Sequence, residues 1–131
     1  MKNKFNQISS FLAFIIWGSW AYFINMDSDN ALISALIQGL YSALMSLSII
    51  CFVDYFYTLL PKKSIYFILP SILTIMITTI LIIIIHFVIN TYDILNTITP
   101  PIIIAFLFSL YTTLKIKKGT TQCLITNQED L

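Results

Sequence analysis

The sequence predicts an all-α integral membrane protein, an antiparallel four-helix transmembrane bundle with both termini on the cytoplasmic side. First, the chain is 58% hydrophobic and only 10% charged, whereas a soluble domain has roughly 45–50% apolar and about 25% charged residues. Second, its mean hydropathy is +0.88, and a globule of this size could not bury so much apolar surface. Third, its basic residues recur in alternate polar segments.

The basic residues predict how the chain crosses the membrane. There are seven of them, namely Lys2, Lys4, Lys62, Lys63, Lys115, Lys117 and Lys118. The two polar segments between these groups, 26–30 and 90–99, contain no lysine. Because lysine beside a membrane span stays in the cytoplasm, the pattern predicts four crossings of the cell membrane. The isoleucine and lysine bias without arginine indicates an AT-rich genome, so we expect a bacterial inner membrane.

The first two spans are predicted at residues 9–25 and 31–58. The first has about the minimum length that crosses the hydrocarbon of a bilayer. Asn30 is the expected N-cap of the second helix, and Pro61 is expected to end it. The second apolar run is longer than the bilayer is thick, so the helix tilts or emerges on the inner surface.

A cleaved signal peptide is the alternative interpretation of the N-terminal segment, because lysines precede its apolar stretch. The bulky residues Trp20, Tyr22 and Phe23 stand where a cleavage site needs small side chains. We therefore expect a retained span.

The last two spans are predicted at residues 66–89 and 100–114. The third is rich in isoleucine, but lipid excludes an open strand and so favours a helix. Pro70 is expected in the first turn of that helix. Thr99 followed by Pro100 predicts the start of the fourth. Together, residues 1–118 form the predicted membrane domain, and the polar tail 119–131 is expected to be disordered.

Small residues predict a close contact between the first two helices. Gly18 is expected at the same depth as Gly39, and Ala35, Gly39 and Ala43 recur every fourth position. Such spacing lets helix backbones approach closely in lipid. The same face could alternatively join two copies of the chain.

Gln38 is a candidate functional polar residue because a buried amide requires a partner. The expected partners are Ser19 and the indole groups of Trp17 and Trp20, which lie at a similar predicted depth. We interpret this as a hydrogen bond between helices. The alternative is a polar point in a ligand cavity that opens outward.

Asp54 is the only acidic residue inside an apolar run. An intramembrane carboxylate suggests function by default, but Asp54 lies close to Lys62 and so near the inner headgroups. A structural or interfacial role is therefore the first interpretation. Coupling to protons or cations is the alternative.

His86 is the single histidine of the chain. It is predicted near the outer end of the third helix, on the opposite side of the membrane from Asp54. We expect an interfacial side chain. A pH-sensing or proton-accepting role is the alternative.

The sequence lacks the patterns of common enzyme classes. It has no Gly-x-Ser-x-Gly or P-loop motif, and no Cys/His pair has metal-ligand spacing. We therefore predict no catalytic residues, cofactor or metal, and two unpaired cysteines, Cys51 and Cys123. The acidic residues Asp27, Asp29 and Asp93 are interpreted as solvated loop residues, with a cation site as the alternative. A net charge of +1 gives no reason to expect nucleic-acid binding.

These features predict a non-enzymatic membrane protein, an accessory subunit or helper of a membrane complex. Its expected partners are membrane lipids and either further copies of the chain or a larger membrane protein. The alternative is a small oligomeric transporter or a flippase for lipids or lipid-linked precursors. A membrane enzyme ranks third because no acid–base pair is within reach.

Overall fold

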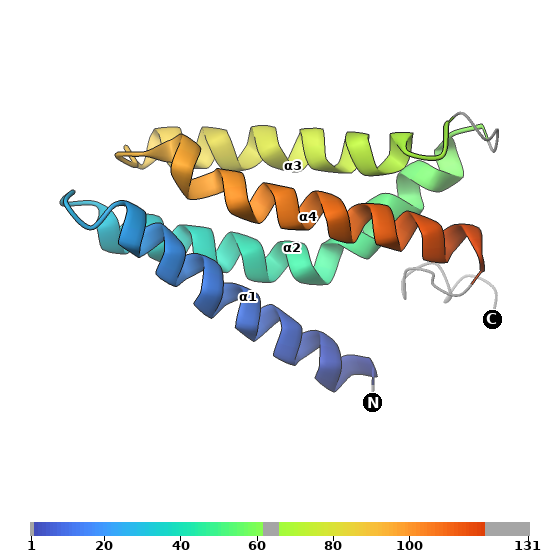
Figure 1. Cartoon of the computed structure of the whole chain (residues 1–131), viewed down its shortest axis with the longest axis horizontal. Helices are drawn as coiled ribbons and strands as arrows, with labels where there is room; N and C mark the ends of the chain where they lie inside the picture. Colours follow the sequence, from blue (N-terminus) through green and yellow to red (C-terminus); the bar gives the residue numbers. More distant parts are fainter. Residues whose placement is uncertain (1, 62–65, 120–131) are drawn as a thin grey trace. The chain divides into compact units, whose positions relative to one another are not determined.

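The computed structural model describes residues 2–61 and 66–119 and is all-helical in those ranges. Its helices are α1 (Lys2–Ile24), α2 (Ala31–Leu59), α3 (Leu69–Val88) and α4 (Ile94–Lys117) (Figure 1). All four are long and apolar enough to cross a membrane, with mean hydropathies of 1.4, 1.9, 2.6 and 1.7. The predicted helical class and the number of candidate spans are therefore confirmed. Most of the predicted tail lies outside the described residues.

Two helices begin and end where local sequence signals predict. Helix α2 starts directly after Asn30 and ends two residues before Pro61. Helix α3 starts at Leu69, so that Pro70 occupies its first turn. Proline suits that position because its missing N–H would have no helical acceptor there.

Helix α4 begins earlier than predicted. Its first residue is Ile94, so the expected start at Thr99 is wrong. Asp93 is the N-cap: its Oδ1 accepts a hydrogen bond of 3.1 Å from the backbone N–H of Asn96. This contact satisfies an N–H of the first turn, which has no acceptor within the helix.

The two prolines that suggested a helix start lie inside α4. Because Pro100 has no N–H, the carbonyl of Asn96 loses its usual helical donor. The indole Nε1 of Trp20 in α1 donates to that carbonyl at 3.0 Å. A side chain from another helix thus replaces the missing bond, which lets the helix continue through Pro100.

The chain divides into two compact units, and each is described by itself below. Unit 1 comprises Met1–Leu47 and Thr79–Ile102. Unit 2 comprises Ser48–Thr78 and Ile103–Leu131. Helices α2, α3 and α4 each contribute residues to both units, while α1 belongs to unit 1.

In unit 1, α1 and α2 approach through their backbones. A Cβ atom on Gly18 would lie 3.1 Å from the carbonyl oxygen of Ala35, and one on Gly39 would lie 2.9 Å from the carbonyl oxygen of Phe14. Gly39 has no room for a side chain, and a side chain on Gly18 would require the neighbouring backbone to shift by a few tenths of an ångström. Further along the same helix pair, the hydroxyl of Ser10 donates to the backbone carbonyl of Ala43 at 3.0 Å.

In unit 2, hydroxyl side chains lie between α3 and α4. Ser71 and Thr113 form a hydrogen bond of 2.7 Å between the two helices. Thr113 also donates to the carbonyl of Ser109 in its own helix at 3.1 Å, so Ser71 is the donor to Thr113.

The prediction of unpaired cysteines is wrong for Cys51, which lies in the unit 2 part of α2. Cys51 is disulfide-bonded. Cys123, the other cysteine for which a free thiol was predicted, lies outside the described residues.

Candidate functional site

The most polar part of the interior of unit 1 is centred on His86. Its side chain is 0% exposed and so is covered by other protein groups; its depth at the outer membrane interface stays a prediction. Its Nε2 lies 2.8 Å from Oε1 of Gln38 in α2. Its Nδ1 lies 2.7 Å from Oγ1 of Thr91, just beyond α3. Both ring nitrogens are therefore engaged.

The end of α3 places Thr91 against the imidazole ring. Asn90 has a φ of 53°, the left-handed conformation that often closes a helix. The N–H of Asn90 then donates to the carbonyl of Phe87 at 3.2 Å, and the N–H of Thr91 to that of His86 at 3.0 Å. This pair of bonds is a Schellman motif, in which the residue after the cap folds back over the last turn.

The partner of Gln38 differs from the predicted ones. None of the three expected partners supplies its hydrogen bonds in the structure; instead, Gln38 Oε1 faces His86 and its Nε2 donates to Ser42 Oγ at 3.3 Å. Gln38 is 2% exposed, and these two contacts use both ends of its amide. Trp20, an expected partner, bonds to α4 instead.

The donors and acceptors of this network can be assigned by elimination. An amide oxygen only accepts, so Nε2 of His86 carries a hydrogen and donates to Gln38. In the neutral ring Nδ1 then accepts, and the donor is the hydroxyl of Thr91. Ser34 lies 2.9 Å from Thr91, and its hydroxyl is the donor in that contact. We call Ser34, Gln38, Ser42, His86 and Thr91 the His86 network; these five residues form one continuous series of hydrogen bonds.

Asn25 joins the α1–α2 turn to the start of α4. It is 0% exposed, and its Nδ2 donates to Oγ1 of Thr97 at 2.7 Å and to the carbonyl of Ala21 at 2.8 Å. Its Oδ1 accepts from the N–H of Asp93 at 2.9 Å. The only signal of this role in the sequence is an asparagine at the end of an apolar run.

Asn30 adds another link between the two turns. Its Nδ2 lies 3.3 Å from the carbonyl oxygen of Ile89 and 3.4 Å from that of Asn90. These carbonyls follow the last residue of α3, where no further helical turn supplies a donor. Figure 1 accordingly shows the α1–α2 turn and the α3–α4 turn together at one end of unit 1.

The other candidate residues are placed differently. Asp54 lies in unit 2 and is 5% exposed, so the structure does not add it to the network of unit 1. Asp93 uses its carboxylate to hold Asn96 through two hydrogen bonds of 3.1 and 2.7 Å. Among the described residues no group of three His, Cys, Asp or Glu side chains could hold a metal ion. The structure therefore lends no support to a cation site among the loop acids.

The His86 network leaves little free chemistry. A general base needs a nitrogen that can reach a substrate proton, and both nitrogens of His86 are bonded to protein. Within the described ranges, only Ser28 and Ser109 have a buried side-chain oxygen without a hydrogen-bond partner. The network thus acts as a join between helices.

These features define an all-helical protein with four helices that could cross a membrane, which is consistent with a multi-pass membrane protein. No protein-family model matches the chain, and no curated protein or solved structure shows significant similarity to it.

Proposed function

We propose that the chain is a small, non-enzymatic integral membrane protein that acts as an accessory subunit or helper of a larger membrane complex. In this proposal it crosses a bacterial inner membrane four times and keeps both termini in the cytoplasm. The His86 network then lies at the outer end of the helices.

The observation that carries this proposal is that the buried amide and imidazole side chains of unit 1 are hydrogen-bonded to protein. The polar side-chain atoms of Asn25, Gln38 and His86 are all hydrogen-bonded to other protein groups. A catalytic or transport site instead presents polar groups to a substrate. The arrangement supports a protein that holds a shape in the membrane.

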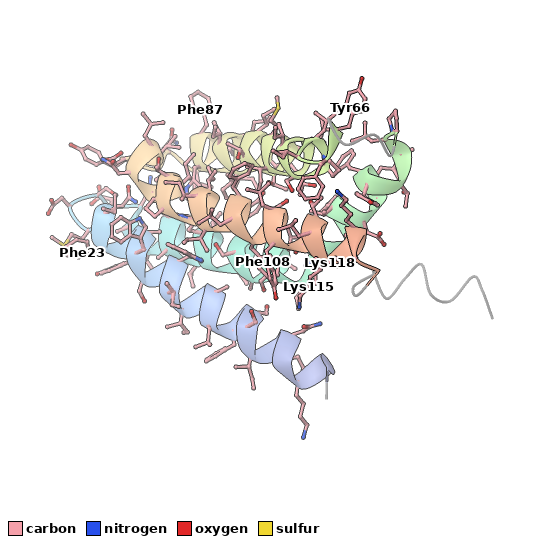
Figure 2. All side chains as sticks on the ribbon, turned by 45° about the vertical axis from the view of Figure 1, so that its right-hand side comes forward. Phe23, Tyr66, Phe87, Phe108, Lys115 and Lys118 are labelled. Carbon is pink, nitrogen blue, oxygen red and sulfur yellow. The ribbon has the colours of Figure 1, made fainter. Side chains whose placement is uncertain are left out.

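The surface of α1 supports association within the membrane. Only 11% of the α1 window is buried, against 28% of the α2 window, so most of α1 is left for lipid or another protein. Its exposed large apolar side chains are Ile8, Phe11, Leu12, Ile15, Ile16, Tyr22 and Phe23. Figure 2 shows Phe23 pointing away from the ribbon.

The lysines at the end of α4 support the proposed orientation. Nζ of Lys115 lies 4.8 Å from the ring centroid of Tyr111, and Nζ of Lys117 lies 4.9 Å from that of Phe67. Aromatic rings and lysines together are typical of the cytoplasmic membrane surface.

Native mass spectrometry of the tagged protein, extracted with its own lipids, tests the proposal. We expect a discrete larger membrane protein at a fixed ratio to the chain. A photo-crosslinking residue at Phe11, on the exposed face of α1, should capture the same protein, whereas one at the buried Ala21 should not. Recovery of only lipid and copies of the chain would contradict the accessory role.

A small transporter or flippase is the second proposal, and the burial of Asp54 favours it. A carboxylate that is 5% exposed within an apolar helix is the kind of group that couples transport to ions. Proton flux into proteoliposomes, followed with a pH-sensitive dye, tests it. We expect Asp54→Asn to abolish a flux that Asp93→Asn retains; equal flux in both variants and the wild type would end this proposal.

A further inference from the structure

The His86 network can take up one proton without losing a hydrogen bond. In the neutral state, the hydroxyl of Ser34 donates to Thr91 and the hydroxyl of Thr91 donates to Nδ1 of His86. A second proton on Nδ1 would make the ring a donor at both nitrogens. Thr91 Oγ1 would then accept from the ring and turn its own hydrogen toward Ser34, while the Nε2 bond to Gln38 stays as it is.

When the direction of these hydrogen bonds is reversed, the hydroxyl of Ser34 also has another acceptor for its hydrogen. Ser34 lies in the first turn of α2, and its N–H donates to the carbonyl of Asn30 at 2.9 Å. A helical serine commonly turns its hydroxyl to this same carbonyl. Each of the 2.7 Å and 2.9 Å contacts of Thr91 therefore pairs a donor with an acceptor in either arrangement of the hydrogens, so only the buried charge opposes the second proton.

The surroundings of His86 offer no negative charge to a protonated ring. Both of its side-chain contacts are neutral, Gln38 from α2 and Thr91 from the loop. The segments of α2, α3 and α4 in unit 1 contain no acidic or basic residue besides His86. The charged residues of this unit are two lysines at the start of α1 and the loop acids Asp27, Asp29 and Asp93. Asp27 and Asp29 are exposed, and the carboxylate of Asp93 holds Asn96.

We propose that His86 is a proton-binding site and that the His86 network is an acid-sensitive join between α2 and the α3–α4 loop. The ligand is a proton taken up on Nδ1. The resulting buried charge has no opposite charge bonded to it, and removal of an ion from water costs several kcal/mol. The ring therefore moves toward the loop and its solvent, and the join opens. This inference is independent of the accessory and transport proposals.

The single histidine makes a direct test possible, because selective 15N labelling gives the signals of one imidazole only. In lipid nanodiscs near neutral pH we expect the tautomer with hydrogen on Nε2. Thr91→Val should shift the Nδ1 signal and leave the Nε2 signal in place. The matched control is Thr99→Val, because Thr99 is exposed and bonds only to its own helix; it should change neither signal. A wild-type ring with hydrogen on Nδ1 would overturn the assignment.

Acidification tests the opening of the join. We expect the ring to become doubly protonated and the backbone amides of Thr91 and Asp93 to exchange at least about tenfold faster, after correction for intrinsic exchange. His86→Gln should lose this response, whereas Asp93→Asn, which keeps a capping side chain, should retain it.

Two results would contradict the proposal. One is a wild-type imidazole that stays neutral down to about pH 4, where loop aspartates themselves take up protons. The other is equal acid-induced exchange in the wild type and in His86→Gln. The first result needs no variant, so it decides the matter even where a substitution prevents folding.

Discussion

The two units satisfy their buried polar side chains in different ways. In unit 1, Asn25, Gln38 and His86 bond to residues far away in the sequence and on other elements. In unit 2, Thr74 and Thr112 donate to the carbonyl of the preceding turn of their own helix. A bond within one helix survives when that helix moves, whereas a bond between elements fixes their register. Unit 2 also has such a bond between helices, from Ser71 to Thr113, but in unit 1 several buried side chains form them.

The largest effect is expected from His86→Ala. It leaves Gln38 Oε1 without its donor and Thr91 without its acceptor, and it opens a cavity where a fully buried ring stood. The expected loss is about 3 kcal/mol of unfolding free energy, measured by denaturant titration in bicelles. A loss below about 1 kcal/mol would mean that the network does not hold unit 1 together.

Asn25→Ala should lower the unfolding free energy by somewhat less, about 2 kcal/mol. The substitution removes two donated hydrogen bonds and leaves the N–H of Asp93 without its acceptor. Thr97→Val is the comparison variant because it removes one of those contacts and keeps the side-chain shape. The same titration should rank Asn25→Ala above Thr97→Val; the reverse order would contradict the assigned contacts.

Substitutions at Asn90 test the backbone that positions Thr91. Its φ of 53° disfavours residues with a Cβ atom, so Asn90→Ala should destabilise the protein by about 1 kcal/mol. Asn90→Gly should be close to neutral because glycine adopts this conformation freely. Equal stabilities of the two variants would show that this helix end is not strained.

The smallest effect is expected in unit 2. Thr74→Val removes a hydroxyl that bonds only to the carbonyl of Pro70. The expected loss of unfolding free energy is therefore about 0.5 kcal/mol or less. Ser71→Ala removes a bond between helices and should cost more. A Thr74→Val loss as large as that of His86→Ala would erase the difference between the two units.

Much of the helical framework could be predicted because local signals determine it. Pro61 and Pro70 mark helix ends through the N–H that they lack. Helix α2 starts directly after Asn30 as predicted, although the Asn30 amide bonds to carbonyls at the end of α3. The start of α4 was mispredicted because Thr99 and Pro100 resemble a helix start. The information that corrects it lies in Trp20, a residue of another helix that supplies the donor that Pro100 lacks.

The centre of the candidate site was beyond a prediction from the sequence. Gln38 and His86 were both identified as candidates, but their contact depends on the register between α2 and α3. The contact of His86 with Thr91 depends on the left-handed conformation of Asn90, which an asparagine permits but does not require. The role of Asn25 depends equally on a loop far away in the sequence.

The most direct test of unit 1 is a double-mutant cycle between Gln38 and His86, with Gln38→Leu, His86→Leu and the double variant unfolded in the same bicelles. A hydrogen bond between two buried partners predicts a coupling free energy of about 1 kcal/mol. If the losses of unfolding free energy in the two single variants sum to the loss in the double variant within about 0.3 kcal/mol, the two side chains do not support each other. That result would contradict a unit held together by this pair.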